Sequence, residues 1–201
     1  NATPRVIYGW AKAGTFFKAF THIDKASGIP RPALWLTFGL SIFWTLPFPS
    51  WEQLISVVSA ALVLSYAIAP VTAAGLRRNA PDLPRPFRVR AFGIIGPVSF
   101  MISALIVYWS GWNTLSWLLG LQIVMFVVYV MCKGKVPEHT VSLAQQVKSS
   151  LWLIVFYALI ILFSWLGSFG GLNVIGHPWD TVLVAAMSLG IYYWGARSCL
   201  P

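Results

Sequence analysis

Lysine and arginine occupy only alternate connections between long apolar runs of this sequence, and this distribution constrains the fold more than any other feature. The chain has fourteen such residues. Segments 1–31, 76–92, 133–150 and 197–201 hold five, five, three and one of them, which accounts for all fourteen. Basic residues collect in the cytoplasmic loops of membrane proteins. The pattern therefore predicts a chain that crosses a bilayer six times, with both of its ends in the cytoplasm.

The composition agrees with an integral membrane protein. Hydrophobic residues make up 58% of the chain, charged residues only 9%, and the mean hydropathy is +0.73. A soluble domain carries about 25% charged residues. The net charge of +9 raises nucleic acid as a partner, but the basic residues lie between apolar runs of membrane-spanning length. Anionic lipid headgroups are the better counter-charge, and we expect the lipid bilayer, not nucleic acid, as the partner.

The apolar runs predict an all-α fold made of a single transmembrane region over residues 1–201, without a soluble domain. Residues 1–31 would form the cytoplasmic end of a preceding helix and a loop. Val6, Trp10, Ala13, Phe17 and Phe20 stand at helical spacing there, which suits either the tail of such a helix or an amphipathic segment on the membrane surface. A helix needs ~20 residues to cross the hydrocarbon core. We expect spans at about 33–50, 53–75, 93–111, 115–132, 151–169 and 180–196. The expected location is the inner (plasma) membrane.

Catalytic, cofactor and metal sites are not expected from this sequence, and we do not expect an enzyme. The three histidines, His22, His139 and His177, fall in three different loops, and the predicted topology places His177 across the membrane from the other two. Cys132 and Cys199 have no metal-binding or redox spacing. No set of ligands for a metal ion can be assembled from these residues.

Two acidic residues stand at predicted helix starts on the uncharged side. Glu52 precedes the second apolar run and Asp180 begins the sixth. A carboxylate at a helix N-terminus is stabilised by the helix dipole. We therefore expect both to stabilise helix ends, with proton coupling as the alternative.

The second apolar run carries the most informative polar pattern. Ser56, Ser59, Val63 and Tyr66 follow one another at steps of three, four and three residues. This spacing places them on one stripe of a helix. Three of the four can form hydrogen bonds, so the stripe suits either a water-filled substrate path or a contact with another helix. Both interpretations stay open on physical grounds.

Small residues four positions apart predict close helix packing at two places. Ala69 pairs with Ala73, and Ala186 pairs with Gly190. Small side chains let two helix backbones approach each other closely. We expect these faces to contact neighbouring helices.

The basic segment supplies a family resemblance. Residues 77–89 read Arg-Arg-Asn-Ala-Pro-Asp-Leu-Pro-Arg-Pro-Phe-Arg-Val. This segment resembles the loop after the tenth helix of amino acid permeases of the amino acid, polyamine and organocation superfamily. Residues 4–34, with Ala-Lys-Ala-Gly at 11–14 and Gly-Ile-Pro-Arg-Pro-Ala at 28–33, are similar to the same family's region from the end of the eighth helix into the ninth. The resemblance is strongest over residues 3 to about 112 and favours permeases of the aspartate:proton symporter type.

The resemblance implies both a fold and a function. This chain would be the C-terminal part, helices nine to fourteen, of an inverted-repeat transporter of the leucine-transporter type. Such proteins hold their substrate at the bilayer midplane between broken helices, which would belong to the missing N-terminal part. The implied function is secondary active amino acid transport by alternating access, as symport with protons. Ser59 maps onto a serine that lines the substrate path, followed by Val63, which departs from a hydroxyl in some relatives, and Tyr66.

The alternative function is a self-contained six-helix membrane scaffold or assembly subunit without transport. The sequence upstream of this chain discriminates between the two. Two Gly-interrupted apolar segments there would favour the transporter, because broken helices form the substrate site of such folds. A nearby start codon would favour the scaffold.

Overall fold

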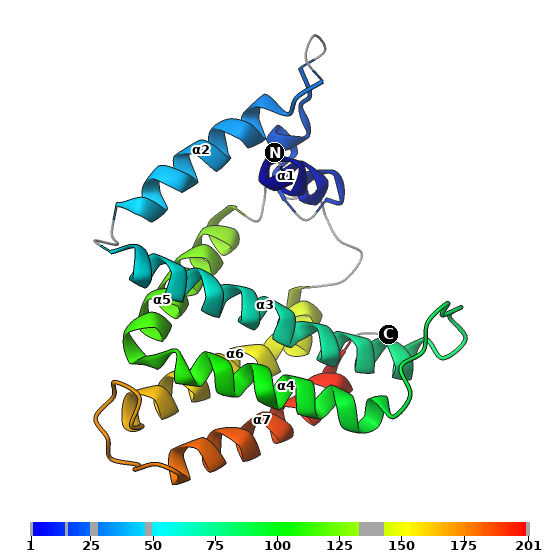
Figure 1. Cartoon of the computed structure of the whole chain (residues 1–201). Coiled ribbons are helices and arrows are strands. Elements are labelled where there is room, and N and C mark those ends of the chain that lie inside the picture. Colours follow the sequence, from blue (N-terminus) through cyan, green and yellow to red (C-terminus); the bar gives the residue numbers. More distant parts are fainter. Residues whose placement is uncertain (1, 15, 25–27, 47–49, 133–142, 200–201) are drawn as a thin grey trace. The chain divides into compact units, whose positions relative to one another are not determined.

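The computed structural model describes residues 2–14, 16–24, 28–46, 50–132 and 143–199 (Figure 1). These residues form seven α-helices and one short 3-10 helix, and the all-α expectation is confirmed over this part of the chain. The chain divides into two compact units. The first comprises residues 1–54 with 122–140, and the second comprises residues 55–121 with 141–201.

The first unit contains three short helical segments that pack together. α1 (Ala2–Lys12) contacts η1 (Lys18–Thr21), and α2 (Arg31–Thr45) contacts both. Pro32 in the first turn of α2 suits a helix start because its missing N–H would have no helical partner there. α2 ends at Thr45, whereas the sequence predicted a span to residue 50; residues 47–49 lie outside the described part.

The buried face of α1 and the apolar stripe noted in the sequence are offset by one residue. Ile7 and Ala11 are buried, whereas Val6 and Trp10, from the predicted stripe, are 48% and 56% exposed. Both pairs share the spacing of four that keeps residues on one helix face. The helical spacing is therefore confirmed over α1, and the apolar stripe lies beside the face that packs within the unit.

The second unit contains most of five long helices. They are α3 (Trp51–Asn79), α4 (Phe92–Trp109), α5 (Gly111–Cys132), α6 (Leu143–Leu166) and α7 (Trp179–Ser198). α4 and α6 both pack along α7 and also contact each other. α3 adds its buried face, Ala60, Leu64, Ala67 and Val71, to the same core. The helices therefore surround one continuous hydrophobic core.

An aromatic cluster fills the middle of this core. The Phe100 ring of α4 lies 5.2 Å from the Phe156 ring and 6.4 Å from the Trp152 ring of α6, and 6.1 Å from the Tyr192 ring of α7, measured between centroids. Aromatic pairs at 4.5–7 Å contribute ~0.5–1.5 kcal/mol beyond their area burial. Phe100 therefore joins three helices through one side chain.

Two helix boundaries of the second unit extend well past the predicted spans into polar sequence. α3 runs on through Arg77 and Arg78 to Asn79, and only Pro81 and the prolines after it exclude further helix. α6 begins at Leu143, eight residues before the predicted apolar run. Its first turns contain Leu, Ala, Gln and Lys, which are strong helix formers. Apolar composition marks where a helix can meet lipid, and propensity extends the helix beyond that point.

Three described helices are long and apolar enough to cross a membrane. They are Trp51–Asn79, Phe92–Trp109 and the Val147–Leu166 part of α6, judged by length and composition. These segments overlap the second, third and fifth predicted spans. The six-span topology and the orientation of the ends stay predictions.

The two ends of the second unit differ in charge. At one end, the Trp112 backbone N–H, after α4, donates to the Phe169 carbonyl, after α6, at 3.0 Å. Both of these connections lack lysine and arginine. At the other end, the Asn79 amide donates to the Cys199 carbonyl at 2.9 Å, so the basic segment lies beside the end of α7. The uncharged connections and the basic segment thus meet at opposite ends of the unit, as the charge pattern predicted.

Glycines on α7 and α3 allow the closest helix contacts. A Cβ atom on Gly195 would lie 2.8 Å from both the Trp152 ring and Val71 Cγ1. A Cβ atom on Gly75 would overlap Cys199. At Gly190, by contrast, no atom of the described residues lies within 4 Å of a Cβ atom, so the predicted close packing is not seen in this part of the chain. The helix face that Gly190 occupies points away from the described core.

We expect Gly195→Leu to destabilise the protein more than Gly190→Leu. Both changes replace a helical glycine, and this replacement favours the helix by ~1 kcal/mol. Only the first forces a side chain against Trp152 and Val71, at an overpacking cost of ~1–3 kcal/mol. The measurement is the thermal unfolding midpoint of the detergent-solubilised full-length protein. Equal midpoints would show that Gly195 is not needed for the contact.

Candidate functional site

The predicted polar stripe lies along the flank of α3, beside its buried face. Ser56 is half-buried, and its hydroxyl oxygen lies 3.0 Å from the hydroxyl oxygen of Thr114 on α5. Thr114 is itself only 8% exposed. A hydroxyl pair of this kind joins two helices in an apolar environment. For Ser56, the interhelical interpretation is therefore supported by a contact.

The other three stripe positions lie further from the core. Val63 is half-buried, Ser59 is exposed, and Tyr66 is 68% exposed. No side-chain hydrogen bond joins Ser59 or Tyr66 to another described residue. Pro70, one turn later, cannot donate an N–H to the Tyr66 carbonyl. The stripe thus presents a hydroxyl, a phenol and one backbone carbonyl without its helical donor on the same part of α3.

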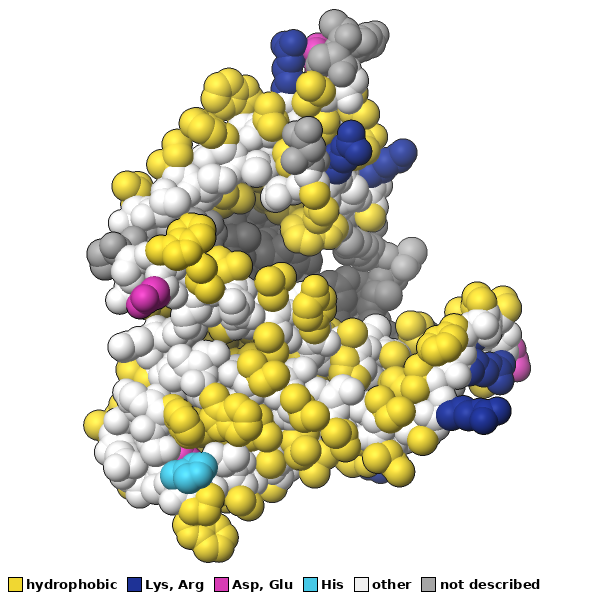
Figure 2. Space-filling model, viewed as in Figure 1, with side chains coloured by type: hydrophobic (Ala, Val, Ile, Leu, Met, Phe, Trp, Pro, Cys, Tyr) yellow, Lys and Arg dark blue, Asp and Glu magenta, His cyan; other side chains and the backbone are white. Residues whose placement is uncertain are grey.

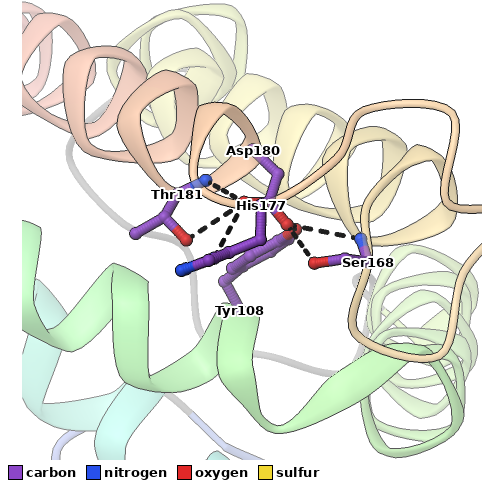
Figure 3. Close-up of polar contacts among 5 residues, drawn as sticks. All are labelled: Tyr108, Ser168, His177, Asp180 and Thr181. Atoms are coloured by element: carbon purple, nitrogen blue, oxygen red, sulfur yellow. Dashed lines mark hydrogen bonds and ion pairs between the residues drawn. The ribbon is translucent and has the colours of Figure 1, made fainter.

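A second polar cluster surrounds the buried carboxylate of Asp180 (Figure 3). Its Oδ2 atom accepts hydrogen bonds from the Tyr108 hydroxyl at 2.7 Å and from the Ser168 backbone N–H at 3.3 Å. The Ser168 hydroxyl donates to the same oxygen. Tyr108 ends α4, Ser168 follows α6, and Asp180 begins α7. One carboxylate oxygen therefore connects three segments of the second unit.

The other carboxylate oxygen faces the start of its own helix. Asp180 Oδ1 accepts a hydrogen bond from the Thr181 backbone N–H at 2.6 Å and from the Thr181 hydroxyl at 3.2 Å. His177 Nδ1 lies 3.6 Å from the same oxygen, and the His177 side chain is 63% exposed. The expected contact with the helix N-terminus is present for Asp180. Glu52, in the first turn of α3, is exposed.

Local backbone geometry positions the donors of this cluster. A Cβ atom on Gly167 would overlap the Tyr108 hydroxyl, so only glycine lets Tyr108 reach Asp180 by this route. After Gly167, the chain turns back, and the Leu172 and Val174 N–H groups donate to the Trp165 and Leu166 carbonyls at 2.7 and 2.9 Å. These bonds satisfy carbonyls at the end of α6 that have no partner within the helix. The returning loop therefore fixes Ser168 beside the carboxylate.

The geometry of the Asp180 cluster favours an anchoring role. The carboxylate is surrounded by neutral donors, and both oxygens are already bonded. A buried carboxylate with this many donors is stabilised as the anion and is expensive to leave unpaired. No group of three or more His, Cys, Asp or Glu side chains that could hold a metal ion was found in the described residues. The cluster can hold three segments together but offers no open position for a ligand.

Sequence reasoning identified Asp180 but missed its partners. Tyr108 and Ser168 are separated from it by 72 and 12 residues. The available signal was the charge pattern, because it places the connections after α4 and after α6 on the same predicted side as Asp180. Hydroxyl-bearing residues in those connections were the candidates for bonding a buried carboxylate.

Comparison with known proteins identifies the chain. The amino acid permease family model matches residues 1–114. The chain belongs to the amino acid permease family. The match covers the region, residues 3 to about 112, where the sequence resemblance was strongest. Since permeases are transport proteins, the expectation that the chain is not an enzyme is confirmed.

Two curated relatives of this permease chain come from Bacillus subtilis strain 168. An aspartate-proton symporter is 56% identical over 202 aligned residues, which cover 100% of this chain and 39% of the relative. The glutamate/serine transporter AimA is 31% identical over 198 residues, which cover 98% of this chain and 36% of the relative. The chain thus spans less than half the length of either relative. No solved structure matches it.

We expect the Asp180 contacts to contribute to the stability of this permease. Asp180→Asn removes the charge and one acceptor facing Tyr108 and Ser168, which costs ~1–3 kcal/mol for a buried polar group left without its partner. The measurement is the thermal unfolding midpoint of the detergent-solubilised full-length protein. Glu52→Gln is the matched control, because Glu52 is an exposed carboxylate in the first turn of another helix.

A double-mutant cycle with Tyr108→Phe isolates the bond between the two side chains. Residues in direct contact show coupling energies of ~0.5–3 kcal/mol. We expect Tyr108→Phe to be less damaging in the Asp180→Asn background than in the wild type. Strictly additive effects would show that the hydrogen bond between them contributes nothing to stability.

Proposed function

We propose that this chain is part of a transporter that carries an acidic amino acid across the membrane together with protons. The single observation that carries the proposal is the 56% identity to an aspartate-proton symporter over the whole of this chain. The second relative is named for glutamate and serine. Both names include an acidic amino acid, and aspartate is therefore the first substrate to test. Alignment along the whole chain counts against a self-contained scaffold.

The chain would supply the C-terminal helices of an inverted-repeat transporter. In such folds, broken helices hold the substrate near the bilayer midplane, and those helices would lie upstream of this chain. Here, six spans would cross the plasma membrane with both ends of the chain in the cytoplasm. The core around Phe100, with Trp152, Phe156 and Tyr192, would be part of the rigid scaffold. Alternating access would move the two halves around the shared substrate site.

α3 would be the helix of this chain that approaches the substrate path. Ser59 and Tyr66 are exposed on its flank, and Val63 lies between them. Exposed hydroxyls on an otherwise apolar helix suit a wet path better than lipid. Ser56, which is bonded to Thr114, would fix the helix at the edge of that path. The stripe would thus combine one helix contact with a path-lining surface.

Transport in proteoliposomes tests the proposed function directly. The full-length transporter would be reconstituted, and uptake of radiolabelled aspartate would be followed under an imposed pH gradient, with the inside alkaline. We expect accumulation above equilibrium, and a protonophore should abolish it. Aspartate accumulation that is indifferent to the protonophore would contradict proton coupling. Absence of uptake for both aspartate and glutamate would contradict the substrate class.

Substitution at Ser59 tests the proposed path. We expect Ser59→Trp to lower aspartate uptake by about tenfold at unchanged membrane abundance, equivalent to ~1.4 kcal/mol. The bulky ring would obstruct the path without entering the buried face of α3. Val58→Trp is the matched control, since Val58 is the preceding residue on a different face and is 47% exposed. Equal uptake by the two variants would remove Ser59 from the path.

A further inference from the structure

The connection between α3 and α4 is folded around one arginine. The Arg85 guanidinium donates hydrogen bonds to the carbonyls of Leu76, Ala80 and Pro81 at 3.1, 2.6 and 3.1 Å. Leu76 lies in the last turn of α3, and Ala80 and Pro81 follow it; the Leu76 carbonyl also accepts a hydrogen bond from the Ala80 backbone N–H at 3.1 Å. Arg85 therefore holds the connection against the end of α3. Its guanidinium group is bonded to backbone carbonyls of the same segment.

A second arginine of this segment also makes a contact within the fold. The Arg77 guanidinium carbon lies 4.0 Å from the centre of the Phe92 ring, which begins α4. A cation over an aromatic face contributes ~0.5–1 kcal/mol at an exposed site. Prolines at 81, 84 and 86 restrict the backbone between these two contacts. The connection between α3 and α4 is thus held by contacts of Arg85 at the end of α3 and of Arg77 at the start of α4.

The other three arginines of the segment project from that surface. Arg78, Arg88 and Arg90 are exposed, and none of them forms a hydrogen bond or ion pair with another described residue. Asp82 is the only acidic residue of segment 76–92. Three guanidinium groups within this short stretch therefore lack a counter-charge from the described part of the chain.

Exposed apolar side chains stand among these arginines. Leu76 is 53% exposed, Leu83 is 55% exposed and Phe87 is 80% exposed. Figure 2 shows hydrophobic and basic side chains side by side over the connection that projects from α3 and α4. A surface intended for soluble anions alone would not need large apolar groups. The mixture suits a boundary between headgroups and hydrocarbon.

We propose that the surface formed by Leu76, Arg78, Leu83, Phe87, Arg88 and Arg90 binds the headgroup of an anionic phospholipid. Guanidinium groups bind phosphate oxygens in a bidentate way. Leu83 and Phe87 would contact the acyl chains of the lipid near its headgroup. The arginines would bind the phosphate and any further anionic group or hydroxyl group of the headgroup. α3 and α4 are both candidate membrane spans, so their connection is tethered at the membrane surface. A lipid of the surrounding bilayer would therefore have direct access to this surface.

This inference goes beyond the proposed transport function and is independent of it. A positive charge that only orients the chain requires no defined pocket and no exposed apolar groups. The contacts of Arg77 and Arg85 hold the connection against α3 and α4, and the other three arginines are exposed within the same short segment. The surface would thus select lipids by their charge as well as set the topology.

Native mass spectrometry of the detergent-solubilised full-length protein tests the proposal. Dioleoylphosphatidylglycerol and dioleoylphosphatidylcholine are titrated separately, and the dissociation constants are compared. The test variant carries Arg78→Gln, Arg88→Gln and Arg90→Gln. The matched control carries Arg5→Gln, Lys12→Gln and Lys18→Gln, which removes the same charge from exposed positions in the first unit.

We expect phosphatidylglycerol to bind the wild type more tightly than phosphatidylcholine, and the loop variant to lose about tenfold in affinity for phosphatidylglycerol. The control should change by less than about twofold, since surface charge acts mainly at short range. Equal losses in the two triple variants would overturn the proposal, as would equal binding of the two lipids by the wild type. If the triple variant does not fold, the single variant Arg88→Gln replaces it in the test, with an expected loss of several fold in affinity for phosphatidylglycerol.

Two further measurements separate a lipid from a free anion. Leu83→Ser with Phe87→Ser should weaken phosphatidylglycerol binding, because the acyl chain contact is lost while the arginines stay. Inorganic phosphate in millimolar excess should not displace the lipid. Complete displacement by phosphate, together with unchanged binding to the serine variant, would show an anion site and overturn the lipid assignment.

Discussion

The carboxylate of Asp180 is the point on which the second unit depends. A chain with so few charges has few ways to specify which apolar helices meet, because one hydrophobic surface packs on another with little preference. A buried anion supplies that specificity, since it is stable only where its hydrogen-bond donors converge. Tyr108 from α4 and Ser168 after α6 meet Asp180 on one oxygen. The aromatic contacts of Phe100 then fill the space between helices whose ends are already joined.

Charge and periodicity in the sequence predicted much of this arrangement. The alternation of basic and uncharged connections predicted which ends would lie together, and the contacts between Trp112 and Phe169 and between Asn79 and Cys199 agree with it. Family membership also followed from the basic segment. The helix boundaries were less predictable, because α6 begins in a polar stretch where propensity rather than hydropathy decides.

Packing faces and hydrogen-bond partners could not be predicted in the same way. Ile7 rather than Val6 is buried on α1, and Gly195 rather than Gly190 makes the close contact on α7. Neighbouring apolar residues have nearly equal hydrophobicity, so only the shape of the opposing helix selects between them. The partners of Asp180 come from other segments of the chain. A buried carboxylate requires hydrogen-bond donors, but the sequence does not indicate which residues supply them. Ser59 and Tyr66 are placed on α3, and their role in a substrate path stays a prediction.

α3 carries both the flank that holds Ser59 and Tyr66 and the first residues of the basic segment. Its 29 residues span ~44 Å at 1.5 Å per residue, whereas the hydrocarbon core is ~30 Å thick. Across a bilayer, such a helix would reach beyond the apolar layer and would carry Arg77 and Arg78 among the headgroups. Ser59 and Tyr66 lie on the same continuous helix, interrupted only by the missing hydrogen bond at Pro70. A tilt imposed where the charged end of α3 would meet the headgroups would therefore change the position of the hydroxyls on its flank.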